Sequence, residues 1–173
     1  MALHKLVLDD DFSEDYSIVA IHCSDEAYKV AFFLNKYVSL RLLRCELDLD
    51  FSSSGLDVTF PLFQFEDTSQ YTHYHLVGNK CKSKEAQIQS SGGLFEAESS
   101  EKTVITYLLP ELKTVDFFLK ISSDYKAVAL KKLSLAINEI KQVISAYPVP
   151  SETIKSRNNL IFDQCQIKRK QKL

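Results

Sequence analysis

Two histidines stand two positions apart in a segment with the alternating pattern of a β-strand, and their spacing is the best in the chain for metal chemistry. His73 and His75 would project from one strand face about 7 Å apart, a separation that two ligands of one ion can have. A zinc site needs a third and fourth ligand, which Cys81 or a carboxylate would have to supply. No third ligand is spaced for them on the same strand, so the sequence predicts surface histidines and no bound metal.

A row of acids gives the second candidate site. Glu46, Asp48 and Asp50 alternate with apolar residues over 45–51, which is typical of a strand with one dry and one wet face. Three carboxylates on one face could gather a divalent cation. Lys or Arg partners on a neighbouring strand would explain the same residues equally well.

Nucleophilic chemistry is weakly represented. The chain has no Gly-x-Ser-x-Gly elbow, no phosphate-binding glycine loop and no His-Glu-x-x-His pattern. His22 and Cys23 are neighbours, but adjacent strand residues point to opposite faces, so they make a poor dyad. Cys45, Cys81 and Cys165 are far apart in the sequence and form no Cys-x-x-Cys pair, which favours reduced thiols. We therefore expect no catalytic residues and no cofactor.

The segment 109–117, Leu-Pro-Glu-Leu-Lys-Thr-Val-Asp-Phe, carries the most distinctive pattern. It resembles the Ile-Pro-Glu-x-x-x-Val-Asp-Tyr motif of the IPExxxVDY family of small bacterial proteins from the Bacteroidota, with Leu109 in place of Ile and Phe117 in place of Tyr. Looser similarity extends over 28–36, 77–80 and 155–162. The resemblance implies a relative in fold and supplies no reaction.

The residues of this motif also have a physical interpretation. Pro110 presets a turn and Glu111 beside it can accept a backbone donor. The pattern predicts a hairpin between 104–109 and 115–121, with Asp116 on the face opposite the core. The core-facing set would be Val115, Phe117, Leu119 and Ile121, and the opposite set Asp116, Phe118 and Lys120. The alternative is a binding surface that uses Glu111 and Asp116.

Composition and charge indicate a globular chain of one domain and a tail. The 173 residues are 45% hydrophobic and 25% charged, and no apolar run reaches the length of a membrane span or a signal peptide, so we expect a cytoplasmic protein. Acids outnumber bases by 12 to 5 in residues 1–66, whereas bases outnumber acids by 6 to 2 in residues 151–173. We expect a domain over 1–150 and a tail over 151–173.

The tail itself divides into two parts. The apolar triplet 160–162 is expected to dock on the domain and to add an edge strand there. The basic end is expected to be mobile and available to an acidic partner. Its candidate binding residues are Lys168, Arg169, Lys170 and Lys172.

Periodicity sets the expected fold. Strands are predicted at 5–8, 17–21, 45–51, 58–65 with a break at Pro61, and 71–77, and a long loop over 82–102. The first helix should follow a Ser24 cap and end near residue 40, with Tyr28, Phe32, Phe33 and Tyr37 widening its buried face. The second should follow Ser123 or Asp124 and continue to Ile144. The sum is an α+β fold in which two helices cover one face of a curved antiparallel sheet of about six strands, with helix-grip-like order.

Three functions fit these features. A non-catalytic interaction or regulatory module, with an unknown protein partner or self-association, accounts best for a chain without a catalytic constellation. The alternative is a domain that holds an apolar small molecule between sheet and helices, lined by some of the 11 Phe and 8 Tyr residues. A nucleic-acid or ribosome-associated role through the basic tail comes third, because the acidic body disfavours a nucleic-acid face on the domain.

Overall fold

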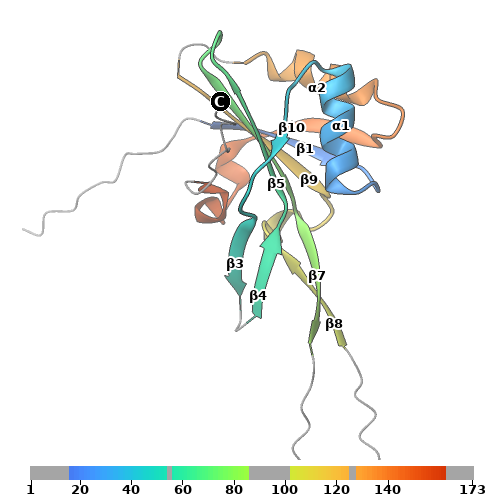
Figure 1. The fold of residues 1–173 in the computed structure, drawn as a ribbon, viewed down its shortest axis with the longest axis vertical. Coiled ribbons are helices and arrows are strands. Elements are labelled where there is room, and N and C mark those ends of the chain that lie inside the picture. Colours follow the sequence, from blue (N-terminus) through green and yellow to red (C-terminus); the bar gives the residue numbers. More distant parts are fainter. Residues whose placement is uncertain (1–15, 54–55, 86–101, 125–127, 163–173) are drawn as a thin grey trace, which may run out of the picture.

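A six-stranded antiparallel sheet with two helices forms the centre of the molecule (Figure 1). The computed structural model describes residues 16–53, 56–85, 102–124 and 128–162. The sheet is open, and its strands in spatial order are β10 (Ser145–Val149), β1 (Tyr16–His22), β9 (Phe117–Ser123), β6 (Thr72–Gly78), β5 (Leu62–Asp67) and β2 (Leu43–Arg44). The predicted α+β class and strand number are confirmed, while the expected strand at 5–8 lies outside the described residues.

The central strands are apolar on both faces. In β1, Val19 and Ile21 point to one face of the sheet, whereas Ile18 and Ala20 point to the other, because successive side chains of a strand alternate. Val19 lies opposite Leu119 of β9, and the apolar side chains of both strands are buried on both faces of the sheet. The sheet therefore has a core on each side.

The two helices cover one face. α1 (Ala27–Tyr37) and α2 (Leu130–Asn138) contribute to a first core cluster with the inward residues of β1, β5, β6, β9 and β10. Neither helix has a side-chain cap: the N-cap residues are Glu26 and Ala129, so the predicted caps at Ser24 and at Ser123 or Asp124 are wrong. Burial of the apolar stripe holds these short helices in place.

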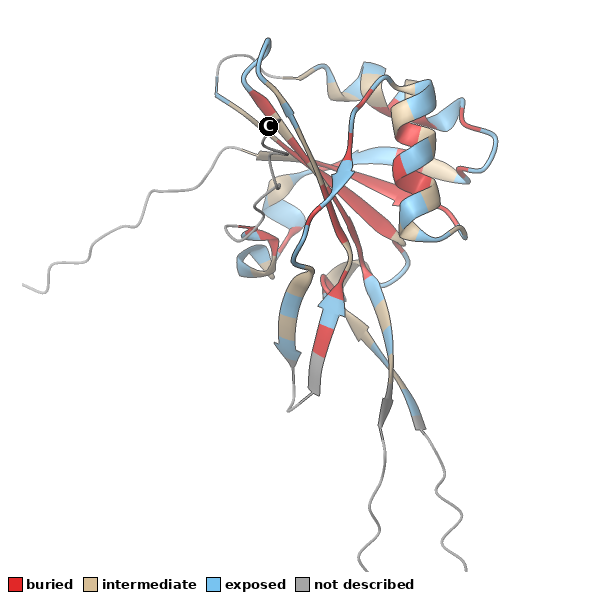
Figure 2. Ribbon diagram, in the orientation of Figure 1, coloured by how far each residue is buried: buried red, intermediate tan, exposed pale blue. Residues whose placement is uncertain are grey.

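Two hairpins and the C-terminal segment close the opposite face. β3 (Leu49–Ser53) pairs with β4 (Leu56–Phe60), and β7 (Lys80–Glu85) pairs with β8 (Lys102–Tyr107). Both hairpins extend beyond one end of the sheet (Figure 1). Three 3-10 turns complete this side: η1 (Pro110–Leu112), η2 (Ser151–Thr153) and η3 (Arg157–Leu160). The second core cluster lies on this side of the sheet, and the buried residues of both clusters are red in Figure 2.

Several predicted elements differ from the observed ones. The strand predicted over 45–51 is interrupted by a bend at Glu46 and Leu47, so that β2 and β3 belong to different sheets. The predicted break at Pro61 is confirmed, and it too separates strands of different sheets. The expected loop over 82–102 is in part the hairpin β7–β8, and residues 86–101 lie outside the described residues.

The second helix is much shorter than its apolar stripe. It ends at Asn138, whose side-chain amide donates to Ala146 O and whose Oδ1 accepts from Ala146 N, at 2.8 and 2.7 Å. This pair of hydrogen bonds turns the chain back into the edge strand β10, where Pro148 is tolerated because an edge leaves one side of the ladder unpaired. Ile144 is therefore exposed, and the long terminal helix of a helix-grip fold is absent from the described residues.

Candidate functional site

The motif residues form a joint between the sheet and the C-terminal segment. Leu109 and Val115 are buried in the second core cluster, with Pro110 opening the turn η1 between them. Phe117 is buried in the first cluster, beneath the helices. The prediction that Val115 shares the face of Phe117 is wrong because Val115 lies before β9 begins and does not follow its alternation.

The predicted hairpin across this turn is also wrong. β8 pairs with β7, whereas β9 pairs with β1 and β6, so the turn connects two different sheets. The face of β9 opposite Phe117 is not wet, since Phe118 and Lys120 are both buried. Strand alternation was predicted correctly, but the sequence could not show that a second layer covers the other face.

Asn79 holds the turn together and was missed by sequence reasoning. Its Nδ2 donates to Leu112 O at 2.8 Å and Val115 O at 3.0 Å, and its Oδ1 accepts from Leu109 N at 2.8 Å. The side chain is fully buried. A polar residue between the apolar end of β6 and the polar start of β7 was the signal available, but its partners lie 30 to 36 residues further on.

Glu111 ties the turn to the C-terminal segment. Its Oε1 accepts from the backbone N–H groups of Lys155 and Ser156 at 2.8 and 2.9 Å, and Ser156 Oγ lies 3.1 Å from Oε2. Burial tends to raise the pKa of Glu111, but the hydrogen bonds outweigh it and lower this pKa below its ordinary value. Glu111 thus accepts backbone donors as predicted, although they come from a distant segment.

Asp116 is engaged on both oxygens. Oδ2 accepts from Cys23 N at 3.1 Å and Oδ1 from Lys80 Nζ at 2.7 Å, while His22 Nδ1 lies 4.0 Å from Oδ2. His22 Nε2 is 3.2 Å from the Tyr147 hydroxyl. The arrangement links β1, β7, β9 and β10, so Asp116 serves the fold and does not offer the free carboxylate that a binding surface would need.

The cysteines do not form a nucleophilic site within the described residues. The Cys23 thiol is buried and lies 3.3 Å from Gln142 O. Burial, aided by the negative charges of Asp25 and Asp116, raises the pKa of Cys23, so the thiol stays protonated. Cys81 is also free, whereas Cys45 is disulfide-bonded, and the expectation of reduced thiols is wrong for Cys45.

The metal candidates are not gathered into a set of three or more ligands in the described part of the chain. His73 and His75 are on one face of β6 as predicted, and the His75 ring packs 5.3 Å from that of Phe162. Asp48 accepts hydrogen bonds from Arg44. A basic partner was expected for the row of acids, but Arg44 lies four residues earlier in the same segment and not on a neighbouring strand. The described residues contain no group of three or more His, Cys, Asp or Glu side chains placed to hold a metal ion.

The start of the tail packs on the domain. Leu160 and Phe162 are buried in the second cluster, while Ile161 is exposed. The segment follows on from the turn η3, which ends at Leu160, and does not form the edge strand that was expected. The buried Lys120 donates to Leu160 O at 2.9 Å, and its Nζ lies 5.3 Å from the Phe162 ring. The basic residues Lys168, Arg169, Lys170 and Lys172 lie outside the described residues.

The outer face of α1 carries exposed aromatic rings. Only Val30, Ala31 and Leu34 of this helix are buried. Tyr28 and Phe32, one helical turn apart, are 57% and 58% exposed, and Tyr37 is 53% exposed. These exposures overturn the prediction that Tyr28, Phe32 and Tyr37 widen the buried face, since Phe33 alone of the four aromatic residues packs partly on the core.

Two lysines lie among these rings. Lys29 Nζ is 5.9 Å from the centre of the Tyr28 ring, and Lys36 Nζ is 5.1 Å from that of Tyr37. Such spacing allows a cation to rest on an aromatic face. Tyr28, Phe32 and the two lysines lie within about 100° of one another around the helix, whereas Tyr37 lies about 180° from Tyr28. We call the set Tyr28, Lys29, Phe32 and Lys36 the aromatic face of α1; in Figure 2 the exposed residues of this helix are pale blue.

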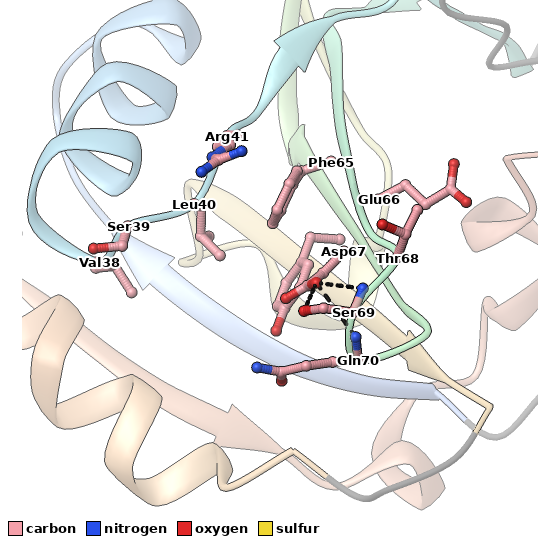
Figure 3. Close-up of a pocket in the computed structure, with 11 residues that line it drawn as sticks. Val38, Ser39, Leu40, Arg41, Phe65, Glu66, Asp67, Thr68, Ser69 and Gln70 are labelled. Carbon is pink, nitrogen blue, oxygen red and sulfur yellow. Dashed lines mark hydrogen bonds between the residues drawn. The ribbon is translucent and has the colours of Figure 1, made fainter.

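A polar pocket of about 480 Å³ opens beside the end of α1 (Figure 3). Residues 38–41 form one wall, and the β5–β6 turn, with Phe65 and Tyr74, forms the other. Two non-glycine residues have positive φ: Ser39 at 62°, which lines the pocket, and Tyr71 at 49°, which follows the lining residue Gln70. Left-handed backbone is uncommon for such residues and is retained where the surrounding structure fixes it.

Comparison with known proteins found no match. No protein-family model, curated protein sequence or solved structure matches the chain. Among the described residues, no helix has the length and apolar character to cross a membrane.

Proposed function

We propose that this protein is a non-catalytic interaction module that docks an acidic segment of a partner protein on the aromatic face of α1. The observation that carries the proposal is the exposure of the Tyr28 and Phe32 rings one helical turn apart on α1. Clustered exposed apolar groups are rare on monomeric proteins and are typical of binding surfaces, where aromatic residues are enriched. A tyrosine or phenylalanine supplies a large contact area with few rotatable bonds to immobilise.

Charge supports an acidic partner. Residues 25–41 and 128–144, which hold both helices, contain six bases and three acids, a net charge of +3. Residues 43–67, which hold β2 to β5, contain one base and six acids, a net charge of −5. Beside the rings, Asp25 and Glu26 balance Lys29 and Lys36, and Lys29 is 3.4 Å from Asp25, so the positive excess lies in Arg41 and residues 128–144. This neighbouring excess would attract an acidic segment to the helix layer.

A separate partner fits this surface better than a second copy does. The acidic region of residues 43–67 would be the complementary surface on another copy, and it differs from the helix layer. A contact between two different surfaces is head-to-tail and closes into a ring only at particular rotations, with filaments as the other result. We therefore assign the surface to a partner of different sequence.

The proposal also concerns the family of the protein and the alternative of a small-molecule ligand. We infer a bacterial protein related to the IPExxxVDY family, in which the motif supports the fold and the aromatic face provides the contact. An apolar small molecule fits less well, because the pocket beside α1 is lined largely by polar and charged residues, among them Arg41, Asp67 and Gln70.

The test compares surface variants that leave the core intact. Affinity capture from native lysate would use the wild-type chain, the double variant Tyr28→Ser, Phe32→Ser, and the control Leu135→Ser, which alters an exposed apolar residue of α2. Each captured protein would then be purified and titrated against the three chains at low and high salt. Light scattering over a range of concentrations would report self-association of each chain.

We expect a partner that binds the wild-type and Leu135→Ser chains but loses at least about tenfold in affinity for the double variant, the scale of one or two interface anchors. Its affinity should fall with salt and its contact region should be acidic. Loss of binding in the control alone, a salt-independent contact, or a dimer of the wild-type chain that the double variant abolishes would each overturn the proposal.

A further inference from the structure

We propose that the pocket beside α1 is a binding site for a free α-amino acid with an apolar or aromatic side chain. Arg41 would hold its carboxylate, Asp67 its ammonium group, and Phe65 its side chain. This goes beyond the docking function of α1, because it assigns a small-molecule ligand to a different surface.

The first observation is that opposite charges line one cavity without pairing. Arg41 lies on the 38–41 side, and Asp67 lies on the β5–β6 side (Figure 3). The two charges still interact, since the positive charge of Arg41 contributes to the lowered pKa of Asp67. Within the described part of the chain the Arg41 guanidinium makes no ion pair or hydrogen bond, so its planar donors are free for a carboxylate.

The second observation is that Asp67 is oriented and ionised. Its Oδ1 accepts from Ser69 N at 3.0 Å, from Gln70 N at 3.3 Å and from the Ser69 hydroxyl, which together close the β5–β6 turn. The Ser69 hydrogen bonds are the main reason that the pKa of Asp67 is lowered. No hydrogen bond to Oδ2 is present among the described residues, so this oxygen can accept from an ammonium group.

The third observation is an apolar surface between the two charges. The rings of Phe65 and Tyr74 stack at 5.7 Å and 19° on the helix side of β5 and β6. Leu40 lies on the other wall, but Leu40 and Tyr74 are both buried, so the half-buried Phe65 provides most of the apolar surface open to a ligand. Burial raises the pKa of Tyr74, which keeps its hydroxyl neutral.

The combination selects the ligand class. A simple anion would meet the Asp67 carboxylate, and a simple cation would meet Arg41, so either would be repelled by one wall. A zwitterion satisfies both, and its side chain removes apolar ring surface from water. Glu66 also lines the pocket, but it lies opposite His73 on the other face of the strand and its carboxylate points away from Arg41 and Asp67 in Figure 3. The volume of about 480 Å³ is ample for one amino acid.

The test is a titration of the full-length chain, followed by amide chemical shifts. The probes are L-phenylalanine and L-leucine, with N-acetyl-L-phenylalanine as the form without an ammonium group and L-phenylalaninamide as the form without a carboxylate. The variants are Arg41→Gln and Asp67→Asn; the latter keeps an oxygen for the turn hydrogen bonds while removing the charge. Arg44→Gln, an arginine outside the pocket, is the matched control.

We expect L-phenylalanine or L-leucine to shift resonances of 38–41 and 65–74 at millimolar concentrations. Removing either charge, from the ligand or from the protein, should weaken binding by about tenfold or more, as for a lost charge-assisted hydrogen bond, and Arg44→Gln should bind like the wild type. Absence of shifts in these segments with both amino acids would overturn the proposal. So would equal binding of the blocked forms, or unchanged affinity of both pocket variants with folded spectra.

Discussion

The turn that carries the motif and the aromatic face of α1 differ in what their side chains contact. At the joint, Asn79, Glu111 and Asp116 all place their polar atoms against other parts of the same chain. On α1, Tyr28 and Phe32 place large rings in water. The polar groups of the turn are therefore hydrogen-bonded within the protein, whereas the rings of the helix are exposed and can contact a partner.

This difference separates a conspicuous sequence pattern from a binding surface. A turn that connects two sheets must satisfy its backbone groups inside the protein, because buried unpaired donors and acceptors are costly. That requirement demands particular residues at particular positions, which produces a recognisable motif. A docking surface on an exposed helix has no such internal requirement, and its residues resemble core residues in the sequence.

The largest expected effect is on the joint. Asn79→Ala would leave Leu109 N, Leu112 O and Val115 O without their side-chain partners, so we expect a loss of about 4 kcal/mol in the free energy of unfolding, measured by urea titration. Asn138→Ala, which removes two hydrogen bonds to one residue in the helix layer, should cost about half as much. Equal losses would mean that the joint is no more important to the fold than the helix layer.

The C-terminal segment provides a second test of the same side of the molecule. Leu160→Ala should lower the free energy of unfolding by about 3 kcal/mol, the scale of a leucine removed from a packed core. Its neighbour Ile161 is exposed, and Ile161→Ala should change stability little. A comparable loss for both variants would contradict the packing of this segment against the second core cluster.

Glu111 should make stability depend on pH. Its pKa is lowered in the folded state, so the contribution is present above the ordinary value of 4.5 and is lost as pH falls through 4.5 toward the folded value. Glu111→Gln keeps an acceptor oxygen but no charge. The difference in unfolding free energy between wild type and variant should be largest near neutral pH, at about 1 to 2 kcal/mol, and should shrink in acid. A difference that grows on acidification would reverse the assigned sign.

The smallest expected effect on stability is on the aromatic face. Phe32→Ser removes a ring that is 58% exposed, so the thermal midpoint should stay within error of the wild type. Val30→Ser, two residues earlier on the buried side, should lower the midpoint clearly. If Phe32→Ser destabilised the protein as Val30→Ser does, Phe32 would belong to the core and the surface would not be free to bind.

Local pattern predicted the fold class and several elements correctly. The β-branched run of β1, the strand over most of β6 and the break at Pro61 all appear as expected, because their signals depend on neighbouring residues. The role of Glu111 as an acceptor was also predicted from its place beside Pro110. The predicted end of the second helix was wrong. Its apolar periodicity continues past Asn138, but the hydrogen bonds of Asn138 to Ala146 end the helix there.

The sequence by itself determined which segments are apolar, where the turn residues lie and how charge is distributed. Only the tertiary structure decided that β8 and β9 belong to different sheets, that Asn79 bonds the turn, and that Arg41 faces Asp67 across a pocket. It also decided which rings of α1 are exposed. The physical reason is that one side of a helix or strand is buried only if another layer covers it. In this protein the covering layers come from parts of the chain far away in the sequence.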